Sequence, residues 1–163
     1  MKLIKIVKLK DVFFQENGDL VESLHHGTGG DVAAGKTRGY GVVTIRLEGG
    51  LLFGIPLRSH IKHKSAFITE NTKGLDYSKA VLIKNNDHVS QDPFTIPQHE
   101  YVRIADRELH IRERFEKYVK KYIKGANAGD KNILNEYRYS TMQNYHVELK
   151  ITPPQLESEG TQP

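Results

Sequence analysis

The first two-thirds of the chain consists of short apolar segments separated by polar and glycine-rich ones. Segments of this kind, rich in β-branched residues, are typical of β-strands. We expect one strand over Lys2–Phe14 and a short second strand over Val21–His25. Six glycines occur from Gly27 to Gly41, which predicts a loop there.

The clearest pair of strands is a hairpin that follows this loop. Tyr40–Leu47 and Leu51–Leu57 are apolar or β-branched, and Glu48-Gly49-Gly50 between them favours a tight turn. Two further short strands are predicted over Ala66–Thr69 and Lys79–Ile83, the second apolar enough to be buried.

The last third of the chain has helical spacing instead. Over Ile104–Lys124 the apolar side chains recur every three or four residues, and the lysines lie mostly outside that stripe. Gly125 is expected to end this helix. The predicted apolar stripe consists of Ile111, Phe115, Tyr118, Val119 and Tyr122.

Two shorter helices and a tail are predicted after it. Asp130 is placed to cap a helix running to Tyr137, and Ser140 to cap another over Thr141–Leu149. Together the elements indicate one α+β domain over 1–151, a compact and partly open antiparallel barrel with helices packed on one side. Residues 152–163 are predicted to form a disordered tail.

The composition narrows the chemistry and the location. Cysteine is absent, which excludes disulfides, thiolate metal sites and thiol nucleophiles. Four lysines among the first ten residues interrupt every apolar stretch, so a signal peptide is not expected. No apolar run approaches the ~18 residues that span a bilayer. We therefore expect a cytoplasmic protein.

Positive charge is concentrated in two segments of a chain whose net charge is +4. Six basic residues and one acidic residue lie between Lys36 and Lys64, and eight basic and four acidic residues lie between Arg103 and Lys124. Clustered positive charge is typical of nucleic-acid binders. It is also typical of an ordinary solvated surface, so charge alone does not decide the function.

One segment matches the phosphate-binding loop of nucleotide hydrolases. Gly30–Thr37 (GDVAAGKT) fits the pattern G-x-x-x-x-G-K-[ST]. That loop needs a helix after it, whose N-terminus helps to bind phosphate, whereas Thr37 leads into a strand-like, glycine-containing segment. We therefore interpret the segment as a loop that brings Lys36 and Arg38 toward an anionic ligand, and a P-loop hydrolase is the least favoured function.

The densest group of chemically active side chains is Arg58–Lys64 (RSHIKHK), directly after an apolar strand. RNA cleavage by internal transesterification needs a base for the 2′-OH proton, an acid for the leaving 5′-oxygen and cations around the phosphorane. Histidine can serve as base and acid near neutral pH, and arginine and lysine supply the positive charge. Such chemistry requires no metal and no cofactor.

Other interpretations of the same side chains stay open. The cluster also suits an RNA-binding module without catalysis. His60 and His63, or His25 and His26, have spacings compatible with zinc, but no convincing further ligand accompanies them.

The tyrosines of the last third are also ambiguous, because they could stack on RNA bases or lie in the core. We predict that Tyr118 and Tyr122 are core residues and leave Tyr137 and Tyr139 open.

Several segments together give the chain a resemblance to a known family. It is similar to the TenpN branch of the toxins of type III toxin–antitoxin systems, over nearly the whole chain to Ile151. The segments that carry the resemblance are Tyr40–Val43, Ile55–Lys64, Gly74–Ala80, Phe115–Val119 and Tyr139–His146.

The resemblance implies a fold, an activity and a partner. It implies an SH3-like barrel like that of the MazF/Kid toxins, elaborated with helices, and a metal-independent endoribonuclease that leaves 2′,3′-cyclic phosphate and 5′-hydroxyl ends. It further implies that a repetitive antitoxin RNA is processed into pseudoknot units that block the active site in a closed toxin–RNA assembly. The biological roles implied are growth arrest and defence against phage.

The resemblance also implies site residues. Ser59, Lys62 and His63 match the active-site pattern of the wider ToxN group, and either Lys36 or Arg38 matches its further basic residue. Arg58 departs from the pattern, because the ToxN branch has a small hydroxyl residue there. We expect the basic side of the long helix to bind the antitoxin RNA. The predicted RNA-binding residues are Arg58, His60, Lys64, Arg112, Lys117, Lys120, Lys121 and Lys124.

Overall fold

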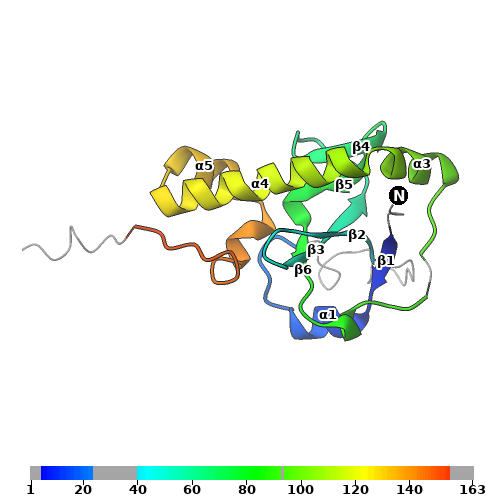
Figure 1. The fold of residues 1–163 in the computed structure, drawn as a ribbon, viewed down its shortest axis with the longest axis horizontal. Coiled ribbons are helices and arrows are strands. Elements are labelled where there is room, and N and C mark those ends of the chain that lie inside the picture. Colours follow the sequence, from blue (N-terminus) through cyan, green and yellow to red (C-terminus); the bar gives the residue numbers. More distant parts are fainter. Residues whose placement is uncertain (1–4, 24–39, 93, 155–163) are drawn as a thin grey trace, which may run out of the picture.

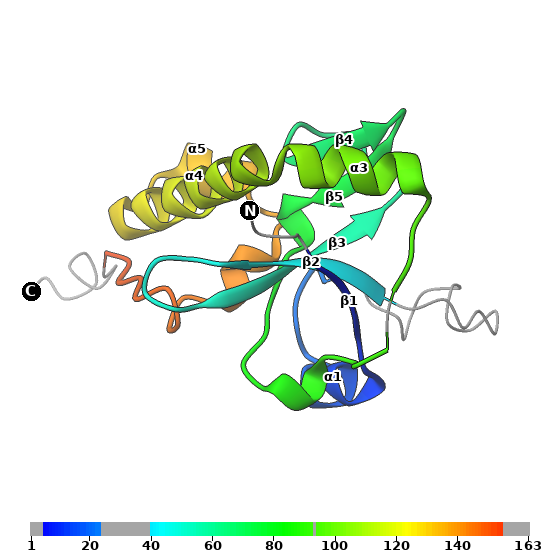
Figure 2. The ribbon, with the colours of Figure 1, turned by 45° about the vertical axis from the view of Figure 1, so that its right-hand side comes forward.

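A computed structural model describes residues 5–23, 40–92 and 94–154, and they form an α+β fold (Figure 1). Its centre is a six-stranded antiparallel sheet, with helices α3 and α4 on one side and the short helix α1 on the other (Figure 2). The strands are β1 (Ile6–Leu9), β2 (Tyr40–Arg46), β3 (Leu52–Arg58), β4 (Ala66–Glu70), β5 (Lys73–Asp76) and β6 (Val81–Leu82).

The sheet is organised around β3, which has neighbours on both edges. The strand order is β1-β2-β3-β5-β4, and β6 also pairs with β3. Along one edge β3 pairs with β2, as in Val43 opposite Ile55, and along the other with β6 and then β5. Within the described residues β1 and β4 stay at opposite ends of this order, so the sheet is not closed into a barrel. The expected α+β class is confirmed, but the expected SH3-like barrel is not.

The β2–β3 hairpin agrees with the sequence prediction, whereas the first predicted strand is shorter than expected. It is limited to β1, and the chain then turns into helix α1 (Asp11–Glu16). Phe13 and Phe14 are both buried. Consecutive side chains on a strand point to opposite faces, so a helix can place both rings in one small core. Residues 21–23 form a turn rather than the predicted second strand, and the rest of that segment lies outside the described residues.

Strand β5 was missed because its sequence, KGLD, has little apolar patterning. It exists through close contact with β4. A side chain at Gly74 would place its Cβ 2.0 Å from the carbonyl oxygen of Phe67. The predicted strand over Lys79–Ile83 is reduced to β6, preceded by the 3-10 turn η1 (Tyr77–Lys79).

The predicted long helix is present but divided and extended. It forms α3 (Gln98–Asp106) and α4 (Glu108–Ala128), which are separated at Arg107. Gly125 does not end α4, because the left-handed residue that closes the helix is Gly129, with φ of 65°. Gly125 instead lies against Ile133 of α5 (Lys131–Glu136).

The two predicted caps are present. Asp130 accepts hydrogen bonds from the backbone N–H groups of Asn132 and Ile133 at the start of α5. Ser140 accepts from Met142 N–H and begins the segment that follows. That segment is a 3-10 turn, η3 (Thr141–Asn144), rather than the full helix expected to Leu149.

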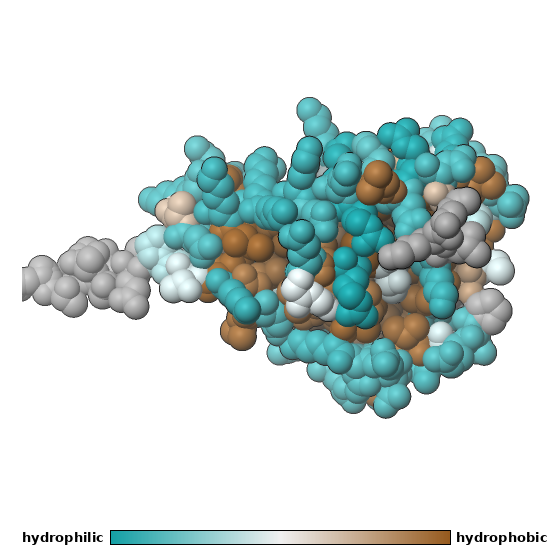
Figure 3. Space-filling view, in the orientation of Figure 1, coloured by the Kyte–Doolittle hydropathy of each residue, from teal (hydrophilic) through white to brown (hydrophobic). Residues whose placement is uncertain are grey.

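Both faces of the sheet are buried. Val43 and Ile45 face the larger core under α4. Every other side chain of the strand points to the opposite face, so Val42 lies with Phe13 in a smaller core at α1. Tyr122 and Tyr137 lie in the larger core and Tyr118 packs against it, as predicted for Tyr118 and Tyr122. The outer side of α4 is hydrophilic (Figure 3).

No helix in the described parts of the chain combines the length and the apolar character needed to cross a membrane.

Candidate functional site

The loop between β3 and β4 presents most of the predicted site residues. Ile61 is buried and anchors the middle of this loop, and its N–H donates to the carbonyl of Thr72 at 2.9 Å. The end of the loop is fixed by Tyr77 N–H, which donates to Ser65 O at 3.0 Å. The polar side chains of the loop before and after Ile61 are exposed, namely those of Ser59, His60, Lys62, His63 and Lys64.

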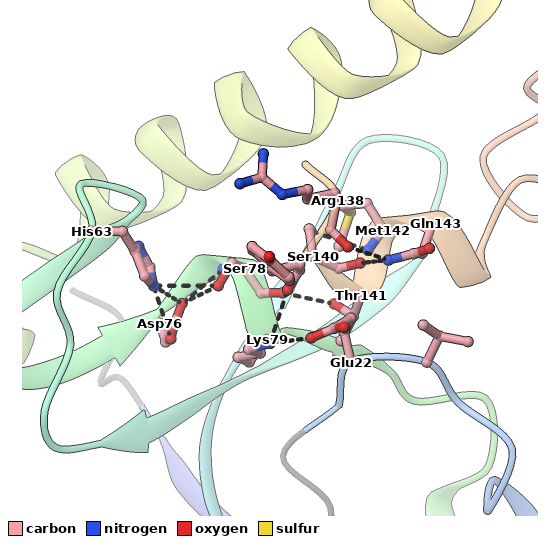
Figure 4. Close-up of polar contacts among 12 residues, drawn as sticks. Glu22, His63, Asp76, Ser78, Lys79, Arg138, Ser140, Thr141, Met142 and Gln143 are labelled. Carbon is pink, nitrogen blue, oxygen red and sulfur yellow. Dashed lines mark hydrogen bonds and ion pairs between the residues drawn. The ribbon is translucent and has the colours of Figure 1, made fainter. Parts of the chain in front are cut away.

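Asp76, at the end of β5, holds this loop in place from the interior of the protein. Its carboxylate is fully buried and pairs with the Arg58 guanidinium at 2.8 Å and with His63 Nε2 at 3.2 Å. Ser78 donates to it through both its hydroxyl (2.6 Å) and its backbone N–H (3.0 Å). These contacts are drawn in Figure 4 for His63 and Ser78. A buried carboxylate needs such partners, because an unpaired charge in the interior is strongly unfavourable.

Two phenols close to Asp76 remain neutral over a wide pH range. Burial raises the pKa of Tyr77 to about 12, although the charge of Arg114 on α4 opposes this. Burial also raises the pKa of Tyr118 well above its ordinary value, and the nearby Asp76 charge adds to the increase. The two phenols therefore add no negative charge beside the Asp76 carboxylate, which contacts Arg58 and His63.

His63 has both ring nitrogens engaged. Its Nδ1 accepts the backbone N–H of Ser65 at 3.1 Å, so this nitrogen carries no hydrogen. The hydrogen is then on Nε2, which points at the Asp76 carboxylate and lies 3.4 Å from the Ser78 hydroxyl. In this arrangement His63 is oriented by Asp76, in the way that carboxylates orient imidazoles elsewhere.

His60 is arranged differently. It is exposed, and its Nδ1 lies 3.1 Å from the hydroxyl of Ser59. Its backbone has φ of 61°, a left-handed conformation that is uncommon outside glycine and that tends to occur at functional sites. Within the described residues its Nε2 makes no hydrogen bond, so this imidazole has a nitrogen directed to solvent.

The remaining predicted cations fall into two groups. In the part of the chain that the structure describes, Lys62 and Lys64 form no ion pair, so their charge is available to a ligand. Lys36 and Arg38 lie outside the described residues, as do His25 and His26.

The basic residues of α4 do not share one face. Successive residues of a helix are rotated by about 100°, so Lys117, Lys120 and Lys124 form one exposed ridge. Lys121 lies beside that ridge and pairs with Glu136 at 2.9 Å. Arg112 lies on the other flank, where it contacts the carbonyl of Arg46 (3.3 Å) and Glu108 (3.5 Å).

The segment that matches a P-loop, Gly30–Thr37, also lies outside the described residues. Its surroundings nevertheless argue against that function. Strand β2 begins at Tyr40, which leaves two residues after Thr37, too few for a helix. The described sheet is also antiparallel, without the parallel strands of P-loop proteins.

Among the described residues, one group has the composition of a metal site: Glu70, His99 and Glu100. Its members already have partners. His99 Nε2 contacts Glu70 at 2.7 Å, and Glu100 accepts from the Thr69 hydroxyl at 3.0 Å. The hydrogen bond from His99 lowers the pKa of Glu70, with smaller contributions from nearby Lys73 and Arg103. These cations disfavour a further positive ion.

A second set of polar contacts adjoins the Asp76 site. The carbonyl of Ser78 accepts from Thr141 at 3.3 Å, and Tyr118 donates to Ser140 at 2.8 Å. Next to Ser78, the ammonium of Lys79 contacts Glu22 at 3.1 Å and the carbonyl of Tyr139 at 2.8 Å. Figure 4 shows this continuous series from His63 to residues 138–143.

Sequence reasoning missed Asp76 and Ser78. Both lie within Gly74–Ala80, one of the segments that carry the family resemblance, but no pattern of charge marked them. The available signal was the excess of six basic residues over one acid from Lys36 to Lys64, since an arginine at the end of a buried strand needs a carboxylate from elsewhere.

No protein-family model matches the chain, and neither the curated proteins nor the solved structures include a match.

Proposed function

We propose that the protein is a metal-independent endoribonuclease that acts as the toxin of a type III toxin–antitoxin system. The observation that carries the proposal is the exposed cationic loop from Ser59 to Lys64. The buried Asp76 carboxylate contacts this loop through His63 and the preceding strand through Arg58. The resemblance of this loop and of Gly74–Ala80 to the TenpN toxins supplies the reaction class. The products would be 2′,3′-cyclic phosphates and 5′-hydroxyl ends.

The contacts suggest how the roles are divided. Lys62 and Arg58 would stabilise negative charge on the phosphorane, with Lys36 or Arg38 as a further cation. Arg58 is held by Asp76 and keeps 29% of its side chain exposed, so it can face a phosphate without moving. His60, with a solvent-directed Nε2 and Ser59 beside it, is suited to proton transfer, and His63 to positioning.

The fold and partners belong to the same proposal. We relate the sheet to the SH3-like barrels of the MazF/Kid toxins, on the grounds of its short antiparallel strands around a central β3 and its C-terminal helices. The partner would be a pseudoknot antitoxin RNA in a heteromeric assembly. The ridge of Lys117, Lys120 and Lys124 would contact its phosphates, with affinity that falls steeply as salt rises.

One observation favours a second candidate, an RNA-binding module without catalysis. Both nitrogens of His63 are occupied within the chain, so this imidazole cannot take a proton unless its Nδ1 leaves the backbone N–H of Ser65. Loss of Lys62 would then weaken RNA binding modestly and no cleavage would be seen.

The test is incubation of purified protein with RNA in excess EDTA, followed by end-group analysis of the fragments. We expect discrete fragments with 2′,3′-cyclic phosphates, lost in Lys62→Ala and in His60→Ala and retained in Lys131→Ala, an exposed lysine of α5. Wild-type protein expressed alone should arrest growth. Intact RNA that is tightly bound would establish the binding module instead, and cleavage that needs added magnesium would contradict a metal-independent reaction.

A further inference from the structure

One tyrosine with a well-exposed side chain, Tyr139, carries an arginine on one face of its ring. Tyr139 is 60% exposed, and the guanidinium carbon of Arg138 lies 4.7 Å from the centre of its ring. With one face covered in this way, such exposure requires that most of the other face is open to solvent. The buried Tyr137 instead donates its hydroxyl to the carbonyl of Tyr118 at 2.7 Å.

The Arg138–Tyr139 pair is held rigidly. One guanidinium nitrogen of Arg138 donates to the backbone and side-chain oxygens of Asn135, at 3.0 and 2.9 Å. The Gln143 amide donates to the carbonyls on both sides of Tyr139, at 3.0 Å for Arg138 and 2.9 Å for Ser140. The Tyr139 carbonyl itself accepts from Lys79 at 2.8 Å. The ring is therefore presented to solvent by a backbone fixed at three consecutive residues.

The pair also lies beside the candidate site. Lys79, which contacts the Tyr139 carbonyl, directly follows Ser78, and Ser78 contacts both Asp76 and His63. Figure 4 shows Arg138 together with this group. A strand of RNA with its phosphate at the loop of Ser59–Lys64 could thus extend toward Tyr139.

We propose that Arg138 and Tyr139 form a binding site for one unpaired nucleobase of the RNA, next to the phosphate that reacts. A flat, rigid aromatic ring with a guanidinium on its other face is the kind of surface on which bases of single-stranded RNA stack. Bases in a duplex are already stacked and cannot use it. The inference rests on the proposed function, because it names the class of substrate, single-stranded RNA, that the site would accept.

The test uses the fact that the chain contains no tryptophan. Tyr139→Trp introduces a single tryptophan at the site, and Val147→Trp places one at a separate position that is 85% exposed. Each variant is titrated with a single-stranded RNA oligonucleotide, with a perfectly paired RNA duplex and with inorganic polyphosphate. We expect saturable quenching only for Tyr139→Trp with the single strand, since polyphosphate has no bases and the duplex has no free one.

Affinity is measured in parallel by fluorescence anisotropy of labelled single-stranded RNA. Tyr139→Ala should weaken binding by about 5- to 150-fold, whereas Tyr139→Phe should bind like wild type, because stacking needs the ring and not the hydroxyl. Circular dichroism of each variant checks that the fold is retained.

The outcomes separate this inference from the proposed function. Full affinity of Tyr139→Ala, or equal quenching of Tyr139→Trp by polyphosphate, would overturn the base site and leave the nuclease proposal standing. Specific quenching without any cleavage by wild type would support the base site and reject the nuclease. Failure of wild type to bind RNA at all would overturn both.

Discussion

Asp76 was not singled out from the sequence, yet its contacts hold the candidate site together. Its buried carboxylate contacts Arg58 at the end of β3, His63 within the loop, and the hydroxyl of Ser78. The loop conformation therefore depends on one charge that no ligand would touch. A positioning role of this kind is separable from catalysis, because it affects stability as well as activity.

We predict that Asp76→Asn lowers the free energy of unfolding by about 3 kcal/mol, since it leaves the Arg58 charge without its partner. The expected value is at the lower end for buried pairs, because 29% of the Arg58 side chain remains in water. Urea unfolding measures the change. Asp87→Asn, at an exposed acid, is the matched control, and an equally small effect of both substitutions would contradict the role given to Asp76.

Among the elements, the contact between α4 and α5 depends on a glycine that sequence rules place at a helix end. Gly125 is in the interior of α4, where glycine is unfavourable relative to alanine by about 1 kcal/mol. The compensation is close packing, because a Cβ at this position would lie 2.4 Å from Cγ2 and 2.6 Å from Cβ of Ile133. The glycine allows α5 to fold back against α4.

We predict that Gly125→Ala destabilises the protein by about 1–3 kcal/mol through overpacking, although alanine is the better helix former. Thermal unfolding followed by circular dichroism measures the effect. The double variant Gly125→Ala, Ile133→Ala should be destabilised less than the sum of the two single variants, because it removes Cγ2 of residue 133, although it keeps the Cβ. Additive or stabilising effects would show that the close approach does not matter.

Elements that depend on local sequence patterns were predicted better than elements that depend on pairing between separate segments. The β2–β3 hairpin, the stripe of α4 and the Asp130 cap depend on local pattern and turn chemistry, and each was predicted. Strand β5 pairs with β3 as well as with its neighbour β4, and the pairing with β3 joins residues that no local pattern connects. The break at Arg107 has no signal in the apolar pattern, which runs through it.

The same distinction applies to the candidate site. The loop residues from Arg58 to Lys64 were recognisable by composition, because their chemistry is dense and contiguous. Asp76 reaches the loop through the pairing of β3 with β5, and the Arg138–Tyr139 pair lies near it through the contact of Tyr139 with Lys79. Their roles in the function stay predictions.

On the scale of the whole molecule, buried tyrosines make the free energy of unfolding depend on pH in the alkaline range. Burial raises the pKa of Tyr77 and of Tyr145 to about 12, and raises that of Tyr122 and Tyr137 as well. In the unfolded chain these phenols ionise near their ordinary value of about 10. As pH rises above that value the unfolded state loses protons first, so it gains stability relative to the folded state.

We therefore predict that the free energy of unfolding falls as pH rises from about 9 toward about 12, where Tyr77 ionises in the folded state. Urea unfolding at a series of pH values measures the slope. Tyr77→Phe should reduce that slope, because one group that titrates differently in the two states is removed. An unchanged slope in this variant would mean that Tyr77 is not protected in the folded protein.

The C-terminal segment closes the larger core, and this has a consequence for synthesis on the ribosome. Leu149 and Ile151 are buried, and the Tyr145 hydroxyl accepts the backbone N–H of Leu82 at 3.1 Å in the middle of the sheet. Synthesis adds about 5–20 residues per second, so the sheet is made seconds before the residues that complete it. The core and the Arg138–Tyr139 surface thus become native only after residue 151 has left the exit tunnel, which delays any activity of the nascent chain until then.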